Sequence, residues 1–418
     1  MKILVIGGGG REHALARKLS LEGNEVHAAP GNPGIAAVAT LHDVDPMDGA
    51  AVAALAASIG AELVVVGPEA PLVAGVADVV RAAGVPVFGP SAAAARLEGS
   101  KAFSKEVMAA AGVPTARSAV CATPAEAEAA FDEFGAPYVV KDDGLAAGKG
   151  VVVTSDRAVA AAHAAACERV VIEEYLDGPE VSLFAVCHHD DEGAGAFPLP
   201  PAQDFKRIFD GDEGGNTGGM GSYTPLAWAS PDLVREVMSE TVLPTLHEMW
   251  DRGTPFSGLL FVGLAITVAG PRVIEFNARF GDPETQSLMA TMTSDLGPLL
   301  YAAATGRLQE APPPAFAGTA CTVVMASRGY PESSSKGDVI TGVSEAEAVP
   351  GVHVIHAGTA LNAAGELVTA GGRVLAVVAT GADLVAARNA AYEAVSKISF
   401  EGAQHRSDIA LKAATGVL

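Results

Sequence analysis

The chain has 418 residues, of which 49% are hydrophobic and 18% charged, so it is long enough for roughly two to four domains. Its formal net charge of −22 argues against a nucleic-acid-binding surface, because phosphate backbones require clustered Lys and Arg. Its four scattered cysteines include no Cys-x-x-Cys pair, which indicates reduced thiols, a cytoplasmic protein and no zinc site. The acidity still leaves room for a nucleotide site in a locally positive region.

Neither a signal peptide nor a membrane span is predicted. The N-terminal apolar run, ILVI, ends at glycine and is too short for a signal peptide. The longest apolar stretch, GLLFVGLAITVA, is interrupted by Gly263 and Thr267 and falls short of the ~20 residues that a membrane-spanning helix needs. We therefore expect no membrane partner.

Strand and helix signals alternate from residue 1 to about residue 95. KILVI, ELVVVG and VPVFG are typical of short buried strands, and the segments between them have helical character. This alternation predicts a parallel sheet with helices on its faces. SKAFSKEVMAAAGVP then predicts a helix with Ser100 as N-cap and Gly112 with Pro114 as its end.

Three further parts follow along the chain. Residues 115 to about 185, with a glycine-rich hairpin at YVVKDDGLAAGKGVVV, predict a small α+β module, and residues 186 to about 305 hold the densest functional motifs. A proline-rich linker precedes strand-like segments that end in a helix. The predicted domains are therefore 1–100, 101–310 with a lid at about 115–185, and a mostly β subdomain at 315–418.

GGGGREHAL, residues 7–15, joins a strand to a helix, where backbone amides can receive an anion. The dinucleotide fingerprint G-x-G-x-x-G fails because its third glycine falls on Glu12, and the second strand ends without the expected acid. A phosphate or sugar-phosphate site that uses Arg11 is favoured over a nicotinamide cofactor. A plain tight turn is the alternative.

Two further segments are rich in glycine. KDDGLAAGKG, residues 141–150, lacks the P-loop spacing but places Lys141 and Lys149 beside a loop able to fold over phosphates. GGNTGGMGSY, residues 214–223, suggests close approach of the backbone to a ligand, since glycine has an entropic cost. An ordinary hairpin turn and a surface loop are the respective alternatives.

Along the strand-like segment VIEFNARFGDPETQ, Glu275, Asn277 and Arg279 share one face because successive side chains alternate. Glu275 and Asn277 are hard oxygen donors suited to Mg²⁺ bound with nucleotide phosphates. Arg279 suits a phosphate or a carboxylate. An internal salt bridge between Glu275 and Arg279 is the alternative. VVIEEYLDGPE, taken by itself, indicates only a solvated strand end.

Taken together, these motifs resemble the glycinamide ribonucleotide synthetases (phosphoribosylamine–glycine ligases), a family of the ATP-grasp superfamily. The resemblance runs nearly end to end, through GGGREHAL, PGNPG, VGPEAPLVAG, DGLAAGKGV, VVIEEYLDGPEVS, PAQDFKR, NTGGMGSY, VIEFNARFGDPETQ, HAGT and GGRVL. NTGGMG and EFNxRFGDPETQ are its most specific parts. It implies an α/β fold with an N-terminal parallel domain, a small α+β lid, a central ATP-grasp domain and a C-terminal mostly β subdomain.

The resemblance implies ATP with Mg²⁺ or Mn²⁺, and ligation of glycine to 5-phosphoribosylamine through an acyl phosphate in de novo purine synthesis. Its implied nucleotide positions are Lys101, Lys141 and Gly148 at the phosphates, Glu173, Glu174, Tyr175 and Leu176 at adenine, Glu180 at ribose, and Arg207 and Asn216. Its implied metal ligands are Glu275 and Asn277. Its implied catalytic residues are Arg279, Asp204 and Lys149. Its implied contacts to glycine and the acyl phosphate are Asp282, Glu284, Gly219, Met220 and Gly221. Its implied contacts to the sugar phosphate are Gly9 and Arg11.

Some positions depart from the family pattern. Gly8 stands where Asn is usual, Phe205 where His is frequent, Gly215 where Pro is usual and Ala278 where Cys is common. Asp142 stands where Ala is common, and a carboxylate beside the phosphates would weaken ATP binding unless it points away. A sister ATP-grasp ligase and a nucleotide-binding regulator without turnover are the rival hypotheses, and a monomer is expected.

Overall fold

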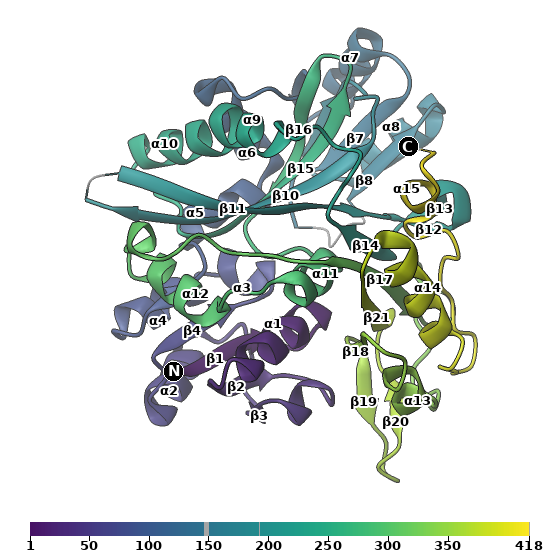
Figure 1. Cartoon of the computed structure of the whole chain (residues 1–418). Helices are drawn as coiled ribbons and strands as arrows, with labels where there is room; N and C mark the ends of the chain where they lie inside the picture. The colour runs from purple at the N-terminus through teal and green to yellow at the C-terminus, as the bar shows by residue number, and fades with distance from the viewer. Residues whose placement is uncertain (146–149, 192, 418) are drawn as a thin grey trace.

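The computed structural model describes residues 1–145, 150–191 and 193–417. Gly148 and Lys149 therefore lie outside the described residues. Figure 1 shows a parallel sheet with helices at one end of the molecule, a small α+β lid at the other, and a large sheet between them. This arrangement confirms the predicted fold class.

The N-terminal part is a parallel sheet of strand order β3-β2-β1-β4-β5. Residues 3–6 of β1 are fully buried because helices cover both faces of the sheet, which explains the uninterrupted apolar run in the sequence. Its elements are β1 Lys2–Gly7, α1 Gly10–Leu21, β2 Glu25–Pro30, β3 Thr40–Leu41, α2 Gly49–Ile59, β4 Leu63–Val66, α3 Glu69–Val73, α4 Val76–Ala82, β5 Val87–Phe88 and α5 Ala92–Gly99.

Helix α6, Lys101–Ala111, follows directly and begins as predicted. The Ser100 hydroxyl accepts a hydrogen bond from the Phe103 amide at 3.2 Å, and Gly112 ends the helix with φ of +67°. An N-cap of this kind stabilises a helix by about 1 kcal/mol.

The lid is a separate antiparallel sheet of order β6-β9-β7-β8 with two helices against it. The predicted glycine-rich hairpin is present, because β7 pairs with β8 from Tyr138 opposite Thr154 to Lys141 opposite Val151. Its elements are β6 Ser118–Cys121, α7 Pro124–Phe134, β7 Tyr138–Asp142, β8 Val151–Thr154, α8 Arg157–Ala166 and β9 Val170–Glu173.

The large sheet has the order β16-β15-β10-β11-β14-β17-β21-β18 and joins the central and C-terminal parts of the chain. Antiparallel pairing of β14 with β17 extends the central sheet into the C-terminal segment, so the C-terminal strands have no isolated sheet edge at this junction. The domain boundaries given above stay predictions. The sheet strands are β10 Glu180–Asp190, β11 Gly193–Asp204, β14 Gly221–Thr224, β15 Gly258–Thr267, β16 Gly270–Asn277, β17 Thr319–Ala326, β18 Val352–His356 and β21 Arg373–Gly381.

Two short hairpins and the remaining helices complete the described fold. The hairpins are β12 Arg207–Phe209 with β13 Glu213–Asn216, and β19 Thr359–Leu361 with β20 Leu367–Thr369. The helices are α9 Leu233–Val237, α10 Leu243–Asp251, α11 Glu284–Thr291, α12 Leu296–Ala304, α13 Val343–Glu347, α14 Leu384–Val395 and α15 Leu411–Thr415. None of the helices in the described part of the chain is long and apolar enough to cross a membrane.

Candidate active site

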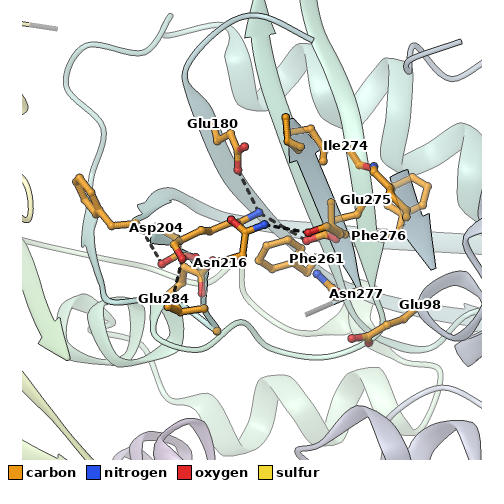
Figure 2. A pocket seen from close by; sticks show the side chains of 18 of the residues that line it. Glu98, Glu180, Asp204, Asn216, Phe261, Ile274, Glu275, Phe276, Asn277 and Glu284 are labelled. Atoms are coloured by element: carbon orange, nitrogen blue, oxygen red, sulfur yellow. Dashed lines mark hydrogen bonds and ion pairs between the residues drawn. The ribbon is translucent and has the colours of Figure 1, made fainter. Parts of the chain in front are cut away.

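A cleft of about 770 Å³ lies where the N-terminal part, the lid and the large sheet meet. Figure 2 shows several of its acidic and amide side chains pointing into one space. Most of the residues expected at a site line it. They are Arg11, Lys101, Lys141, Glu173, Glu174, Tyr175, Leu176, Glu180, Asp204, Arg207, Asn216, Glu275, Asn277, Arg279, Asp282 and Glu284.

The strand β16 presents Glu275 and Asn277 to the cleft. Glu275 lies opposite Gly263 of β15 and Asn277 opposite Phe261, so the two side chains stay on one face despite a bulge at Ile274. Figure 2 shows both on the same wall of the cleft. The sequence-based placement of the two oxygen donors is therefore seen in the structure.

Arg279 lies beyond the end of β16 and pairs with other acids. Its guanidinium is 3.0 Å from the Glu98 carboxylate and 3.4 Å from that of Glu69, both from the N-terminal part of the chain. Among the described residues, the ion pair that Glu275 makes is with Lys206, at 3.7 Å. The internal Glu275–Arg279 bridge considered from the sequence does not form in this structure.

The Glu275 carboxyl is kept ionised. Burial by itself would raise its pKa, but Lys206, Lys141 and Lys101 outweigh that effect and lower the pKa below its ordinary value. An ionised carboxylate beside an amide oxygen fits a hard divalent cation. The described residues contain no group of three or more His, Cys, Asp or Glu that could hold a metal by themselves, so further ligands would come from phosphates and water.

Lys206 was present in the PAQDFKR motif but received no role from the sequence. Its ammonium is 3.1 Å from the Glu180 carboxylate and 3.7 Å from that of Glu275, so it bridges the predicted ribose and metal positions. Burial opposes its charge, but Glu180, Glu275 and Asp204 raise its pKa. In the sequence, only the PAQDFKR motif could have pointed to a role for Lys206, because the three acids around it come from different strands.

Glu173 is buried between two lysines. Its carboxylate oxygens lie 3.0 Å from the Lys105 ammonium and 2.9 Å from that of Lys141. Lys141 also donates to the Ile274 carbonyl at 2.8 Å, which ties the lid to β16. Removing one partner from a buried charge group of this kind costs about 3–5 kcal/mol. With its carboxylate paired in this way, Glu173 has only its backbone groups left for a ligand in the cleft.

The neighbouring carboxylate points outward. Glu174 accepts from the backbone amide of Arg117 at 3.0 Å and from its guanidinium at 2.9 Å. Lys105, like Lys206, was not assigned from the sequence, although SKAFSK contains it. Only the tertiary structure shows that this lysine is paired with Glu173.

The beginning of the glycine-rich loop is fixed to the N-terminus of α6. The Asp143 carboxylate accepts from the Ser100 hydroxyl and the Ala102 amide, each at 3.0 Å, and also pairs with Arg169. Burial would raise the pKa of Asp143, but these donors lower it. Lys101 donates to the Gly144 carbonyl at 2.9 Å.

Asp142 points away from the cleft. It lies on β7 next to Lys141, so the two side chains project to opposite faces. The Asp142 carboxylate contacts the Cys167 thiol, whose pKa is raised by burial and by that carboxylate. The unusual acid therefore does not face the lysines at the predicted phosphate position.

In the first glycine-rich loop, an internal carboxylate takes the place expected for an anion. Glu12 accepts from the Gly9 amide at 2.7 Å and from the Arg11 guanidinium at 2.6 Å. Arg11 also donates to the Phe280 carbonyl at 3.1 Å and lines the cleft, whereas Gly9 does not. The loop thus presents a guanidinium, rather than a row of free amides, to the cleft.

A second acidic group lies on the other side of the cleft. Burial and the Glu284 carboxylate raise the pKa of Asp204 well above its ordinary value. Burial also raises the pKa of Glu284, which accepts from the Ser182 hydroxyl at 2.8 Å. Asp282 is paired instead with Arg373 of β21 at 3.2 Å, and the sequence had given GGRVL no role.

The GGMG glycines are explained by contacts within the chain. Gly219 has φ of +112°, and a Cβ there would lie 2.4 Å from the Pro283 side chain. A Cβ at Gly221 would lie 2.6 Å from the Thr322 carbonyl oxygen, and Met220 is fully buried in the core. None of these three residues lines the cleft. Their predicted contact with substrate stays a prediction.

Comparison with known families accounts for almost the whole chain. Residues 1–98 match the N domain of phosphoribosylglycinamide synthetase, residues 99–285 its ATP-grasp (A) domain and residues 320–412 its C domain. The chain belongs to the phosphoribosylglycinamide synthetase family. This membership confirms the resemblance inferred from the motifs.

Relatives that match this chain over nearly its full length support the family membership. The phosphoribosylamine–glycine ligase of Streptomyces coelicolor is 64% identical over 99% of this chain and all of its own, and that of Mycobacterium tuberculosis is 54% identical over 100% and 99%. The crystal structure of the Thermotoga maritima phosphoribosylamine–glycine ligase superposes with a TM-score of 0.83 at 33% identity, covering 98% of this chain and 100% of that one. A Campylobacter jejuni biotin carboxylase shares the fold alone, with a TM-score of 0.71 at 14% identity over 97% and 92% of the chains.

Proposed function

We propose that this protein ligates glycine to 5-phosphoribosylamine with ATP, giving glycinamide ribonucleotide, ADP and phosphate, as the second step of de novo purine synthesis. The family membership and the names of the relatives support this assignment. The observation that carries it is that Arg11, the lysines and the Glu275–Asn277 pair all line one cleft. A sugar phosphate and a nucleotide can therefore meet in one enclosed space.

The nucleotide would lie between the lid and the large sheet. We assign adenine to the backbone of residues 173–176, ribose to Glu180, and the phosphates to Lys101 and Lys141, with Arg207 and Asn216 as further nucleotide contacts. Lys206, already between Glu180 and the metal pair, would contact the same ligand. The loop that contains Gly148 and Lys149 keeps its proposed role as a cover over the phosphates.

Glu275 and Asn277 would hold Mg²⁺ or Mn²⁺. The bound cation would neutralise charge on the phosphates while phosphoryl transfer takes place. The donor set fits, because Glu275 is ionised and Asn277 is a neutral oxygen donor on the same face.

The acidic and basic groups on the other side of the cleft would bind glycine. A glycine carboxylate oxygen attacks the γ-phosphorus of ATP, the bond to the β-phosphate oxygen breaks, and ADP leaves. Arg279 would orient the glycine carboxylate and stabilise the acyl phosphate. Asp204 and Glu284, whose pKa values are raised by burial, would receive the glycine ammonium group.

The amine of phosphoribosylamine then attacks the acyl carbon, phosphate leaves, and the nitrogen loses a proton. Arg11 would hold the sugar phosphate so that this amine reaches the acyl group. Asp282, which is paired with Arg373, lines the same cleft as Arg11. We further propose that the active protein is a monomer. The four free cysteines support a cytoplasmic setting.

The test is ADP release by the purified protein with ATP and Mg²⁺, omitting one substrate at a time. Phosphoribosylamine is made in situ from ribose 5-phosphate and ammonia. Turnover that requires both glycine and phosphoribosylamine is the expected result. Turnover with another acid or amine would assign the protein to a sister ligase. ATP binding without turnover on any pair would favour a regulator.

A further inference from the structure

Arg406 is a buried arginine that the proposed reaction does not use. Its side chain is only 1% exposed, and it lies in the segment between α14 and α15 near the C-terminus. Burying a guanidinium is costly unless its donors are satisfied. The partners of Arg406 therefore indicate what this residue holds in place.

One half of the guanidinium binds its own segment. Nε lies 2.7 Å from Asp408 Oδ1 and Nη2 lies 2.7 Å from Asp408 Oδ2, a bidentate pair with fixed geometry. The other half binds the β12–β13 hairpin, where Nη1 lies 2.7 Å from Asp212 Oδ1 and 3.2 Å from the Arg207 carbonyl oxygen. Arg406 thus connects the C-terminal segment to two places in the hairpin: the first residue of β12 and the turn between β12 and β13.

Neighbouring hydrogen bonds also join the C-terminal segment to the hairpin. Ser407 donates its amide to Asp210 Oδ1 at 2.7 Å, and the Gly211 amide donates to Asp408 Oδ2 at 2.8 Å. Each residue of the hairpin tip, 210–212, is therefore bonded to residues 406–408. The tip also needs such support, because Asp212 has φ of +59°, which residues other than glycine rarely adopt.

The hairpin carries two of the proposed nucleotide contacts. Arg207 and Asn216 lie opposite each other in its ladder and both line the cleft. Asn216 donates to the Val151 carbonyl oxygen at 3.2 Å, which joins the hairpin to the first residue of β8 in the lid. The guanidinium of Arg406 also lies 5.0 Å from the ring centre of Phe205, another residue of the cleft wall.

We propose that Arg406 is a positioning residue for nucleotide binding, which holds the β12–β13 hairpin so that Arg207 and Asn216 face the nucleotide and the lid meets Asn216. Figure 1 shows the C-terminal helix α15 beside β12 and β13, and Ala410, Lys412 and Ala413 of this region line the cleft. The C-terminal segment is thus part of the nucleotide pocket. The proposal rests on the proposed function, since it requires a nucleotide in this cleft.

The first measurement is ADP affinity by calorimetry for the full chain, Arg406→Gln and Asp212→Asn. We expect Arg406→Gln to weaken ADP binding roughly 10-fold or more, and Asp212→Asn roughly 3-fold, because the second change leaves the Asp408 pair intact. The KM for ATP should rise by similar factors while the KM for glycine changes less than about two-fold. Arg406→Lys, which keeps the charge but loses the bidentate geometry, should restore only part of the affinity.

Hydrogen exchange of residues 207–216 provides the second measurement, and it should be faster in Arg406→Gln than in the unaltered protein. Arg81→Gln is the matched control, because Arg81 donates to the Gly89 carbonyl at 2.7 Å in the N-terminal part and touches no hairpin residue in the described structure. It should lower the melting temperature without changing ADP affinity. Asp212, whose side chain is 58% exposed, keeps the test available if Arg406→Gln fails to fold.

Unchanged ADP affinity and unchanged exchange in the hairpin would overturn the positioning role. The positioning role would also be overturned if Arg406→Gln only lowered the fraction of folded, active protein, as Arg81→Gln does, and left ADP affinity unchanged. Failure of the unaltered protein to bind ADP would instead overturn the proposed function itself.

Discussion

Two groups of carboxylates face the same cleft, yet their surroundings move their pKa values in opposite directions. Glu275 lies near three lysines, which lower its pKa despite burial. Burial raises the pKa values of both Asp204 and Glu284, and the nearby Glu284 carboxylate raises that of Asp204 further. The ionised Glu275 carboxylate is therefore suited to a cation. Ionisation of Asp204 or Glu284 costs free energy unless a positively charged group lies beside it. Carboxylates that line the same cleft can therefore differ in protonation, because each pKa depends on the groups next to it.

The largest effect is expected at the lysine-surrounded acid. Glu275→Ala should reduce ligation by about 10³-fold, because no other described carboxylate on that face can replace the metal ligand. Steady-state ADP release measures this, and circular dichroism checks that the fold is retained. Asp251→Ala, at an exposed acid that ends α10, is the control and should keep full activity. Unaltered turnover in Glu275→Ala would refute the metal assignment.

Asp204→Asn should separate activity from stability. Turnover should fall about 10- to 100-fold if this acid receives the glycine ammonium group. Because the folded-state pKa is raised, the fold binds more protons than the unfolded chain between the ordinary pKa of 3.8 and the raised value, so ionisation at neutral pH destabilises the fold. The neutral amide should therefore raise the melting temperature at pH 7, by roughly 1 °C for each 1 kcal/mol gained in a chain of this length.

The comparison variant is Glu275→Gln, which should not raise the melting temperature, because the ionised form of Glu275 is the one that its lysines stabilise. A calorimetric scan of both variants at pH 7 is sufficient. Equal shifts in the two proteins would show that the two acidic groups have the same electrostatic character.

Lys206→Gln should raise the pKa of carboxyls in both groups, because Lys206 lowers the pKa of Glu275, Asp204 and Glu284. This lysine is the closest cation to Glu275, so its removal should raise the Glu275 pKa and move the acidic limb of the pH–rate profile upward by on the order of one pH unit. The profile of kcat/KM for ATP between pH 5 and 9 measures it. Arg235→Gln, an exposed arginine on α9, is the control, and an unmoved limb in Lys206→Gln would contradict the assigned charge coupling.

Arg11→Ala should have the smallest effect on both acidic groups. The KM for phosphoribosylamine should rise about 10-fold while the KM for ATP changes little, because Arg11 lies on α1 of the N-terminal part, whereas Lys141 and Glu173 belong to the lid. Initial rates at varied concentrations of each substrate distinguish the two constants. If both stay unchanged, the sugar phosphate binds elsewhere.

Sequence patterns were reliable where the information is local. The helix that begins at Ser100, the glycine-rich hairpin after Lys141 and the parallel N-terminal sheet all follow from caps, turns and apolar runs. Patterns were less informative where partners come from distant segments. The ties between Glu173 and Lys105, and between Asp282 and Arg373, depend on elements that only the fold brings together. The GGMG glycines show a third case, since their reason is close packing against Pro283 and β17.

The sequence by itself determined that Glu275 and Asn277 would share a face, because side chains on a strand alternate whatever the strand packs against. It also determined the family, because the specific motifs occur in order along almost the whole chain. Only the tertiary structure decided that Arg279 pairs with Glu98 rather than Glu275, that Asp142 points away, and that Lys206 bridges two acids. Charge pairing depends on distances of a few ångströms between side chains from separate elements, and those distances are set by packing.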